Sequence, residues 1–586
     1  MLSFKAPVDL YLNDTGLISV SNGAAGILVG TGAVYNIHVP TYAAYVEYSA
    51  MTDCDTDGVA ETVNWYINGV LVEEGKAVVT DGDNVAKAIT STTTEVKVVG
   101  NADLTSGADL GGANEITFVG TGADGSSIDL GSTKNTASGK SLTFKDLTIK
   151  RTSTNYAGFH HSAAETYINC TIEGELWTYG TDVVFENCTF VQPRSDKYNI
   201  WTYTADKVTF NTCTFESAGK SVLIYNECGD TISSQVATFN DCTFKASTPV
   251  EGKAAIEIDS SCLDKNDEYF TVNINGNTTA TGFAEGSVSK NTLYNVKKDS
   301  TDKARTTIVL NGEQIIADGL TQNVETKAYS VSNANGLALC GGVDGYFKKG
   351  GTFNITATID MTGKTYVVPT IKTAALTING QGNAIENLTV EGGTYAALLG
   401  RVSKSVTIDN LTIANSTFAA EDDKDGEYTS AAFVAWAEVH ESSNKVIIKN
   451  STVDNVKIGS SKYVGGFVAY QSGIKLTIDG CTIKNSTITN DYYDAKDLAY
   501  KGHAGGVVGH LYNGIIENTT VENTQFHVEG ARYGAILGTA QDTAVIGAGN
   551  TVKNVTFNGV KAVSVGDAVG AVDSRADKTT VVAGLQ

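Results

Sequence analysis

A short strand-like segment recurs along the first half of the chain, and this recurrence restricts the fold more than any other feature. It reads DLTI (146–149), NCTI (169–172), NCTF (187–190), TCTF (212–215) and DCTF (241–244). The steps between its second positions are 23, 18, 25 and 29 residues. A fixed segment with a loose period is typical of a solenoid that keeps one strand in each coil and varies its loops. We therefore predict a right-handed parallel β-helix, in which equivalent residues stack about 4.8 Å apart.

The cysteines of this segment are predicted to point into the β-helix. Cys170, Cys188, Cys213 and Cys242 share one position with Leu147, which is apolar and carries no sulfur. A small apolar side chain packs well against its copies above and below. Stacked neighbours also fall within disulfide range, where Cα separations are about 4.4–6.8 Å. Because Leu147 fills the same position, we favour reduced, packed thiols over disulfides.

A second series of repeats begins after residue 328. It places five asparagines on one register, at Asn415, Asn455, Asn485, Asn523 and Asn554. Asparagine suits a β-helix turn because it tolerates the left-handed backbone region and its amides can bond along the stack. We therefore predict an asparagine ladder.

Small-residue motifs lie between these strands: AALLG (396–400), AAFVA (431–435), GGFVA (465–469), GGVVG (505–509) and GAILG (534–538). Over residues 390–575 this pattern resembles the GLUG-type repeat of bacterial surface and phage-associated β-helices. The resemblance implies a β-helical fold and says little about chemistry.

The composition indicates an almost all-β chain, with 61 Gly, only 5 Pro, and many Thr, Val, Ile, Tyr and Asn residues. We predict a small β-sandwich or barrel domain over 1–78, an attachment module in which YVEYS (45–49) is a strand and WYINGVLVEEG contains a hairpin. The first β-helix covers 79–296 and begins with a cap helix near 83–89, with Asp83 or Asn84 as N-cap. A β connector over 297–328 and a second β-helix over 329–586 follow.

The charge excludes some partners. The chain has 42 basic and 65 acidic residues, a formal charge of −23. Such a surface repels a phosphate backbone and anionic lipid, so we predict no nucleic-acid binding. No apolar run approaches the roughly 20 residues that span a bilayer, so we predict no membrane insertion. The start, MLSFKAPVDLYLNDTG, lacks the apolar segment of a secretory signal, so the chain is either used without export or has lost its signal.

One strand of each coil in the first array carries unusual outward residues. The segments FHH (159–161), LWTY (176–179), IWTY (200–203), VLIY (222–225) and IEID (256–259) are equivalent. Strand alternation points Leu176, Ile200 and Val222 inward. The outward residues are then His160, Trp177, Tyr179, Trp201, Tyr203, Tyr225, Glu257 and Asp259. Aromatic rings beside acids suit an interface with glycan or protein, although a loop or a neighbouring subunit could also cover them.

Catalysis is the weaker interpretation of this face. Glu257 and Asp259 are two residues apart on one strand face, about 7 Å, which is within the range of glycosidase carboxylates. Parallel β-helices include pectin- and capsule-degrading enzymes, which this chain resembles in fold only. The chain lacks both the NTD, DD, GHG and RIK motifs of polygalacturonases and the calcium-site acids and Arg base of pectate lyases.

A calcium site is the only cofactor that the sequence indicates. DCDTDGVAETVN (53–64) places Asp53, Asp55, Asp57 and Glu61 at positions 1, 3, 5 and 9 of an EF-hand-like loop. Position 12 is Asn64 instead of the bidentate Glu, so a plain Asp-Gly turn is the alternative.

Two loops in the second array are further binding candidates. AAEDDKDGEY (419–428) is acidic, and NDYYDAKDLAYKGH (490–503) combines aromatic and acidic residues. Loops on one side of a solenoid often carry binding, although charge runs are commonly only solvated.

Three functional classes remain. We favour a non-enzymatic bacteriophage virion protein, a fibre, spike or capsid decoration that presents its β-helix to host-surface glycans. The alternative is a secreted bacterial surface adhesin or surface-layer component, and the second alternative is a polysaccharide lyase or hydrolase. The virion class predicts a homo-oligomer, with a trimer favoured, that contacts other virion proteins and surface polysaccharide. The adhesin class predicts an extracellular or cell-surface location.

Overall fold

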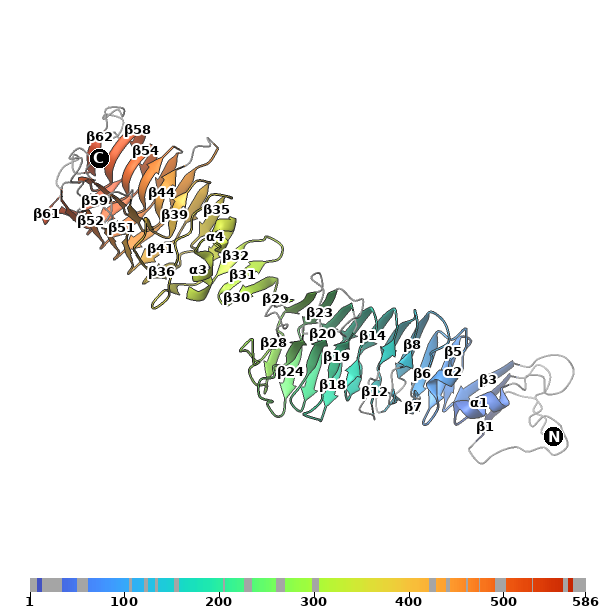
Figure 1. Ribbon diagram of the computed structural model, residues 1–586. Coiled ribbons are helices and arrows are strands. Elements are labelled where there is room, and N and C mark those ends of the chain that lie inside the picture. The colour runs from blue at the N-terminus through green and yellow to red at the C-terminus, as the bar shows by residue number, and fades with distance from the viewer. Residues whose placement is uncertain are drawn as a thin grey trace, which may run out of the picture. The chain divides into compact units, whose positions relative to one another are not determined.

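The fold comes from a computed structural model that describes residues 8–12, 34–49, 62–104, 108–120, 125–131, 135–151, 158–203, 206–225, 234–259, 269–297, 305–420, 428–438, 443–459, 462–473, 475–490, 502–529, 531–561 and 568–572. The chain divides into two compact units, unit 1 over residues 1–312 and unit 2 over residues 313–586 (Figure 1).

Unit 1 is a stack of coils whose strands pair in parallel with the equivalent strands of the next coil. Sheet 1 contains β5 (Lys76–Thr80), β6 (Glu95–Val99), β8 (Glu115–Gly120), β11 (Ser141–Lys145), β14 (Ala164–Ile168), β17 (Asp182–Glu186), β20 (Lys207–Asn211), β23 (Ser234–Asn240), β26 (Tyr269–Asn275) and β29 (Thr306–Leu310). Sheet 2 contains β7 (Asn101–Asp103), β9 (Ser127–Asp129), β12 (Thr148–Lys150), β15 (Thr171–Glu173), β18 (Thr189–Gln192), β21 (Thr214–Ser217), β24 (Thr243–Ala246) and β27 (Thr279–Thr281). Sheet 3 contains β16 (Leu176–Trp177), β19 (Ile200–Tyr203), β22 (Val222–Tyr225), β25 (Ile256–Asp259) and β28 (Tyr294–Lys297), and β10 (Asn135–Thr136) pairs with β13 (Phe159–His160).

The core of unit 1 consists of columns of like side chains. Phe118, Phe144, Tyr167 and Phe185 stack on successive sheet 1 strands with centroids 4.6–4.8 Å apart. The cysteine column is also buried, and the described cysteines are free thiols, as predicted. In unit 2, burial raises the pKa of Cys481 to about 12, so this thiol stays neutral.

The residue before each Cys or Leu of the repeated segment turns the coil. Asp146, Asn169, Asn187, Thr212 and Asp241 all have φ between 52° and 53°. Asp and Asn tolerate this left-handed conformation better than most residues do. Asn169 donates to Asp146 at 3.0 Å and Asn187 donates to Asn169 at 2.9 Å, so these turns are also bonded along the stack.

The N-terminal segment differs from the prediction. The described part of 1–78 contains a four-stranded sheet of β1 (Val8–Tyr11), β2 (Val34–Val39), β3 (Thr62–Ile67) and β4 (Val70–Leu71). Residues 1–7, 13–33 and 50–61 of the predicted sandwich or barrel lie outside the described residues. The β3–β4 hairpin was predicted, but YVEYS belongs to helix α1 (Tyr42–Tyr48). Thr41 caps this helix, and its tyrosines, three residues apart, pack on the core of the sheet. In so short a segment, this helical spacing of apolar residues is easily mistaken for the alternation of a strand.

Short helices lie at the start of both arrays. In unit 1, α2 (Val85–Ala88) confirms the predicted helical turn, and its N-cap Asn84 accepts from the amide of Ala86 at 3.0 Å. In unit 2, α3 (Ala334–Cys340) and α4 (Tyr346–Lys349) lie within the range 329–586, for which only a β-helix was predicted. Leu337 and Phe347 from these helices are buried in the core of unit 2. They therefore shield apolar surface at the open end of that array.

The predicted connector 297–328 crosses the boundary between the units. Strand β29 pairs in parallel with β26 as a further rung of unit 1. Unit 2 opens with antiparallel strands β30 (Glu313–Ala317), β31 (Leu320–Asn323) and β32 (Tyr329–Val331).

Unit 2 is a second parallel stack with more strands in each coil. Sheet 4 contains β33 (Gly351–Ile355), β35 (Leu376–Asn379), β40 (Val406–Asp409), β45 (Val446–Lys449), β50 (Leu476–Asp479), β54 (Val508–Glu517) and β58 (Leu537–Ile546). Sheet 5 contains β34 (Ile359–Asp360), β36 (Ala384–Glu386), β41 (Thr412–Ala414), β46 (Thr452–Asp454), β51 (Thr482–Lys484), β55 (Thr520–Glu522) and β59 (Thr551–Lys553). Sheet 6 contains β37 (Thr389–Glu391), β42 (Thr417–Ala419), β47 (Lys457–Gly459), β52 (Thr487–Asn490), β56 (Gln525–Val528), β60 (Thr556–Phe557) and β61 (Val560–Lys561). Sheet 7 contains β38 (Tyr395–Ala396), β43 (Thr429–Ala431), β48 (Tyr463–Gly465), β53 (His503–Gly505) and β57 (Arg532–Gly534). Strands β39 (Leu399–Val402), β44 (Val434–Glu438), β49 (Val468–Ser472) and β62 (Val569–Val572) form sheet 8, which joins sheet 4 through β54 and β58.

The asparagine ladder of unit 2 is confirmed. All five predicted asparagines have φ between 47° and 55°. Asn455 donates to Asn415 at 2.8 Å, and Asn554 donates to Asn523 at 3.2 Å. The small-residue motif marks a corner between sheets 7 and 8, where a Cβ on Gly505 would lie 1.9 Å from the carbonyl oxygen of Val508. Only glycine fits so close an approach.

None of the helices among the described residues has the length and apolar character needed to cross a membrane.

One carboxyl group interrupts the apolar core of unit 1. Glu165 on β14 lies in register with Leu142 and Val183 and is buried. It accepts hydrogen bonds from Ser162 at 2.6 Å and Tyr167 at 2.8 Å. Burial raises the pKa of Glu165 from 4.5 to about 7, against the opposing effect of the two donors. The protonated form is therefore favoured in the fold.

We predict that this group makes unit 1 less stable as the pH rises. The folded state binds the proton more tightly than the unfolded chain, so the contribution is complete below about pH 4.5 and is lost by about pH 7. Between these values wild type should lose on the order of 3 kcal/mol relative to Glu165→Gln, which holds no titratable proton. Urea denaturation of both proteins at both pH values measures the difference, and parallel pH dependences would contradict the assignment.

Candidate ligand-binding site

Sheet 3 has the inward and outward columns that strand alternation predicted. Strands β16 and β19 align Leu176 with Ile200 and Trp177 with Trp201. Farther along, β22 and β25 align Leu223 with Glu257 and Tyr225 with Asp259. Leu176 and Ile200 are buried in the core, as expected for the inward column.

The outward rings largely cover one another. We call Trp177, Tyr179, Trp201, Tyr203 and Tyr225 the aromatic face. Trp177 and Trp201 stack with centroids 4.2 Å apart and planes 9° apart, and Tyr203 lies 5.1 Å from Trp177. Trp177 is 8% exposed and Tyr179 is 7% exposed, whereas the other three are half-buried. A sugar ring cannot therefore take the face of Trp177 that Trp201 already occupies.

His160 lies at the edge of the aromatic face. It is half-buried, and its ring meets that of Tyr179 edge-on with centroids 5.1 Å apart. The alignment of FHH with LWTY placed His160 in the column of Trp177, but its ring meets Tyr179, and β13 pairs with β10 instead of joining sheet 3.

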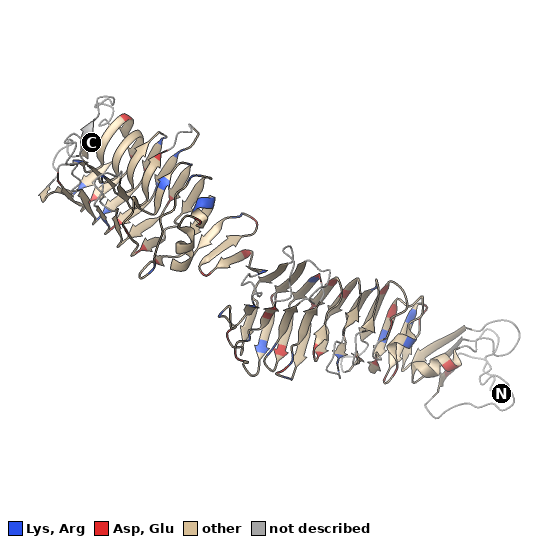
Figure 2. Cartoon of the chain, in the orientation of Figure 1, with Lys and Arg blue, Asp and Glu red and all other residues tan. Residues whose placement is uncertain are grey.

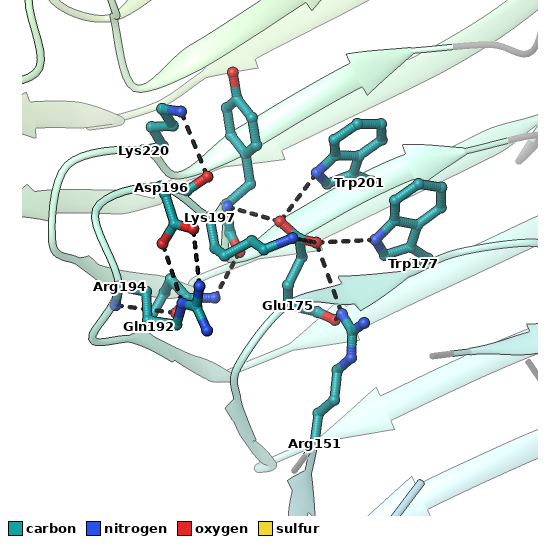
Figure 3. Close-up of polar contacts among 10 residues, drawn as sticks. Arg151, Glu175, Trp177, Gln192, Arg194, Asp196, Lys197, Trp201 and Lys220 are labelled. Atoms are coloured by element: carbon teal, nitrogen blue, oxygen red, sulfur yellow. Dashed lines mark hydrogen bonds and ion pairs between the residues drawn. The ribbon is translucent and has the colours of Figure 1, made fainter. Parts of the chain in front are cut away.

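The segment after β18 supplies another cover. Gln192 accepts from the amide of Arg194 at 3.1 Å and donates to the carbonyl of Tyr198 at 2.9 Å, which fixes this turn (Figure 3). The ring of Tyr198 then meets Trp201 edge-on, with centroids 6.0 Å apart. Burial raises the pKa of Tyr198, so its hydroxyl stays neutral.

Glu175 connects the aromatic face to this turn. It precedes β16, its side chain is 5% exposed, and its two carboxylate oxygens accept from Trp177 and Trp201 at 3.2 Å each (Figure 3). The amide of Tyr198 also donates to it at 2.9 Å. The guanidinium of Arg151 lies 3.7 Å away. A buried carboxylate needs such partners, because an uncompensated charge in the interior is costly.

A pocket opens beside Glu175. It has a volume of about 320 Å³, and its charged lining comprises Lys150, Arg151, Glu173, Glu175, Arg194 and Lys197. Cations outnumber acids in this lining, although the whole chain carries a charge of −23. We call it the basic pocket. Figure 2 shows that charges of both signs occur along unit 1, so the cationic excess here is local.

Sequence reasoning missed Glu175, Arg151 and the basic pocket. Glu175 lies two residues before Trp177, so strand alternation would have placed both on the outer face. Arg151 follows directly after the DLTIK strand. The contact between Arg151 and Glu175 depends on how the coils stack and on the 192–198 turn, and no local sequence pattern specifies either of them.

Glu257 and Asp259 lie on β25 as predicted, but each has a cationic neighbour. Glu257 is buried, accepts from the amide of Ala254 at 2.8 Å and lies 3.2 Å from the amine of Lys253. Asp259 lies 3.0 Å from the amine of Lys297. Both carboxyl groups are therefore engaged with other groups of the chain.

The candidate calcium ligands Asp53, Asp55, Asp57 and Glu61 lie outside the described residues. Asn64, the residue at position 12, is part of β3 and donates to Asn36 at 3.0 Å. Within the described ranges, no group of His, Cys, Asp and Glu side chains could hold a metal ion. Most of the loops 419–428 and 490–503 also falls outside the description.

Unit 2 has an aromatic cluster of its own, which the sequence analysis missed. Trp436, Tyr470 and His510 are aligned on β44, β49 and β54, and the Trp436 and Tyr470 centroids are 4.1 Å apart. Each follows directly after a small-residue motif, a regularity visible in the sequence. His503 stacks on Tyr463 at 5.0 Å, and burial lowers the pKa of His503 to about 2, so it stays neutral.

Comparisons with known proteins add little to this geometry. No protein-family model matches the chain, and no curated protein matches it. Among solved structures, the PL6 family alginate lyase AlyGC is similar, with 10% sequence identity and a TM-score of 0.17 over 85% of this chain and 99% of that chain. A likeness this weak carries no argument about activity.

We predict that Glu175→Ala destabilises unit 1 by about 3 kcal/mol or more, because it leaves Arg151 buried without its carboxylate partner and removes three hydrogen bonds. Glu173→Ala is the matched control. Glu173 is an exposed acid in the same pocket, so its loss should change stability by about 0.5 kcal/mol or less. Urea denaturation measures both, and equal effects would show that Glu175 does not organise the site.

Proposed function

We propose that the protein is a non-enzymatic, glycan-binding β-solenoid and that unit 1 binds surface polysaccharide at the basic pocket and the adjoining aromatic face. The basic pocket carries this proposal. Its volume of about 320 Å³ falls at the lower end of the roughly 300–1,000 Å³ usual for ligand pockets. Its lining combines charged side chains with Gln192 and the apolar Val191 and Pro193, a mixture that suits a polar ligand with hydroxyl groups.

The half-buried rings support the same proposal. Trp201, Tyr203 and Tyr225 lie on adjacent strands of sheet 3 and retain partial exposure. Each ring has an apolar face, which can stack on a sugar ring, and a polar group, which can hydrogen-bond to sugar hydroxyls. Because the strands stack coil upon coil, an extended chain has room to run across several of them.

Catalysis is not part of the proposal. The polysaccharide lyase or hydrolase alternative was based on fold analogy and on Glu257 and Asp259, and both of these residues are engaged with lysines. A glycosidase requires one carboxyl group with a raised pKa and one ionised carboxylate.

We further propose that the protein is displayed at a surface, either as a trimeric fibre, spike or decoration of a bacteriophage virion or as an adhesin of a bacterial cell. The GLUG-like pattern of unit 2, which is similar to repeats in both settings, supports this placement.

Trp201→Ala should lower glycan affinity about tenfold, or about 1.4 kcal/mol. The change removes a half-buried ring and its bond to Glu175, which borders the basic pocket. Tyr470→Ala, which removes a half-buried outer ring in unit 2, should leave affinity unchanged. Glycan-array screening followed by calorimetry on the best ligand measures this. Equal losses in both variants, or an array without any bound glycan, would contradict the proposal.

Two measurements test the proposed display on a virion. Mass spectrometry of purified virions should detect the chain among the structural proteins, and mass photometry of the purified protein should show particles of three chains. Detection only in the envelope fraction of cells would assign the protein to the adhesin class. A monomer absent from both fractions would contradict surface display.

A further inference from the structure

Arg151 lies in the wall of the basic pocket. It directly follows β12, and its side chain is 4% exposed. Nη1 donates to the backbone carbonyl of Glu175 and lies 3.7 Å from the carboxylate of the same residue (Figure 3). Burial lowers the pKa of Arg151, and Glu175 opposes this shift. An arginine remains charged under such conditions.

Two donors of this guanidinium lack acceptors. Nε and Nη2 of Arg151 are buried and make no hydrogen bond to any described part of the chain. A buried donor without a partner costs about 1–3 kcal/mol. Nε and Nη2 lie on the same side edge of the planar group, and this edge can donate two parallel hydrogen bonds to one carboxylate.

The other cations are placed at the rim of the same pocket. Lys197 is 30% exposed and lies 3.8 Å from Glu175, a distance that leaves its amine only loosely paired. Arg194 is more exposed and pairs with Asp196 at 2.8 Å. A partly exposed lysine and a buried arginine in one pocket make an attractive environment for an anion.

We propose that the basic pocket binds the carboxylate of an acidic sugar, a uronate residue of a polysaccharide, on the Nε and Nη2 edge of Arg151, with Lys197 as the second cation. This inference rests on the proposed glycan-binding function and names its ligand class. Because both nitrogens are closed to solvent in the unliganded chain, the pocket wall opens around the guanidinium as the ligand enters. Glu175 holds the guanidinium from its other side.

The test is calorimetry on the full chain with short oligosaccharides of galacturonate, mannuronate and guluronate, and with a hyaluronan tetrasaccharide. The carboxyl-reduced form of each oligosaccharide and a sulfated neutral trisaccharide are the comparison ligands. At least one oligouronate should bind ten times or more tightly than its reduced form. Arg151→Lys, which keeps the charge but loses the two-donor edge, should remove at least tenfold of that preference and leave the reduced form unaffected.

Glu186→Gln, at an exposed acid of β17 outside the pocket lining, is the matched control and should bind the oligouronate as wild type does. Lys197→Ala changes a partly exposed side chain and should fold normally, with several-fold weaker binding of the oligouronate. If Arg151→Lys does not fold, this variant tests whether the basic pocket binds the carboxylate. Stronger, Arg151-dependent binding of the sulfated trisaccharide would overturn the carboxylate assignment. Binding of neutral glycans without any preference for uronates would overturn this inference alone, whereas binding of no glycan would overturn the proposed function as well.

Discussion

Each coil in both units takes its backbone hydrogen-bond partners from the coils above and below, and the rest of the structure depends on this parallel stacking. It places every side chain about 4.8 Å from the equivalent side chains of neighbouring coils. Side chains that tolerate their own copies are therefore favoured. The stacked Phe118, Phe144 and Phe185 rungs, the buried thiols and the asparagine ladders are three solutions to this requirement. Glu165 is an exception, a buried carboxyl group that accepts hydrogen bonds from two hydroxyl donors and whose pKa is raised by burial.

The same constraint explains why the candidate site lies outside the coils. Inward columns must remain uniform to fill the core, but outward columns and the turns between strands can vary. Trp177 and Trp201 follow the stacking rule and cover each other. The turn at 192–198 then adds charged groups around Glu175, where stacking does not dictate the residue type. Among the described residues, no group accepts from Nε and Nη2 of Arg151, so the arrangement is incomplete at this point.

The stacked columns of like side chains could be predicted from the sequence, because each column corresponds to a residue position that recurs in every repeat. The register of LWTY against IWTY, the inward thiols and the asparagine ladder were all confirmed. Helix α1 was missed because its short window carries Tyr and Val, which are common in strands, and α3 was missed because its short window contains Asn and Gly, which are poor helix formers. Alternation gave the side of the sheet on which Trp177 lies, but it could not give the cover that buries it. The contact between Arg151 and Glu175 joins successive coils of variable length, so no local pattern specified it.

The central claim is that an acidic glycan meets the chain at the basic pocket and the adjoining aromatic face of unit 1. Hydrogen–deuterium exchange of the full chain, with and without a bound oligouronate, tests this claim most directly. Protection should concentrate at residues 150–151 and 173–203, with the peptides of unit 2 unchanged. Protection confined to unit 2, or to the N-terminal sheet, would contradict the account.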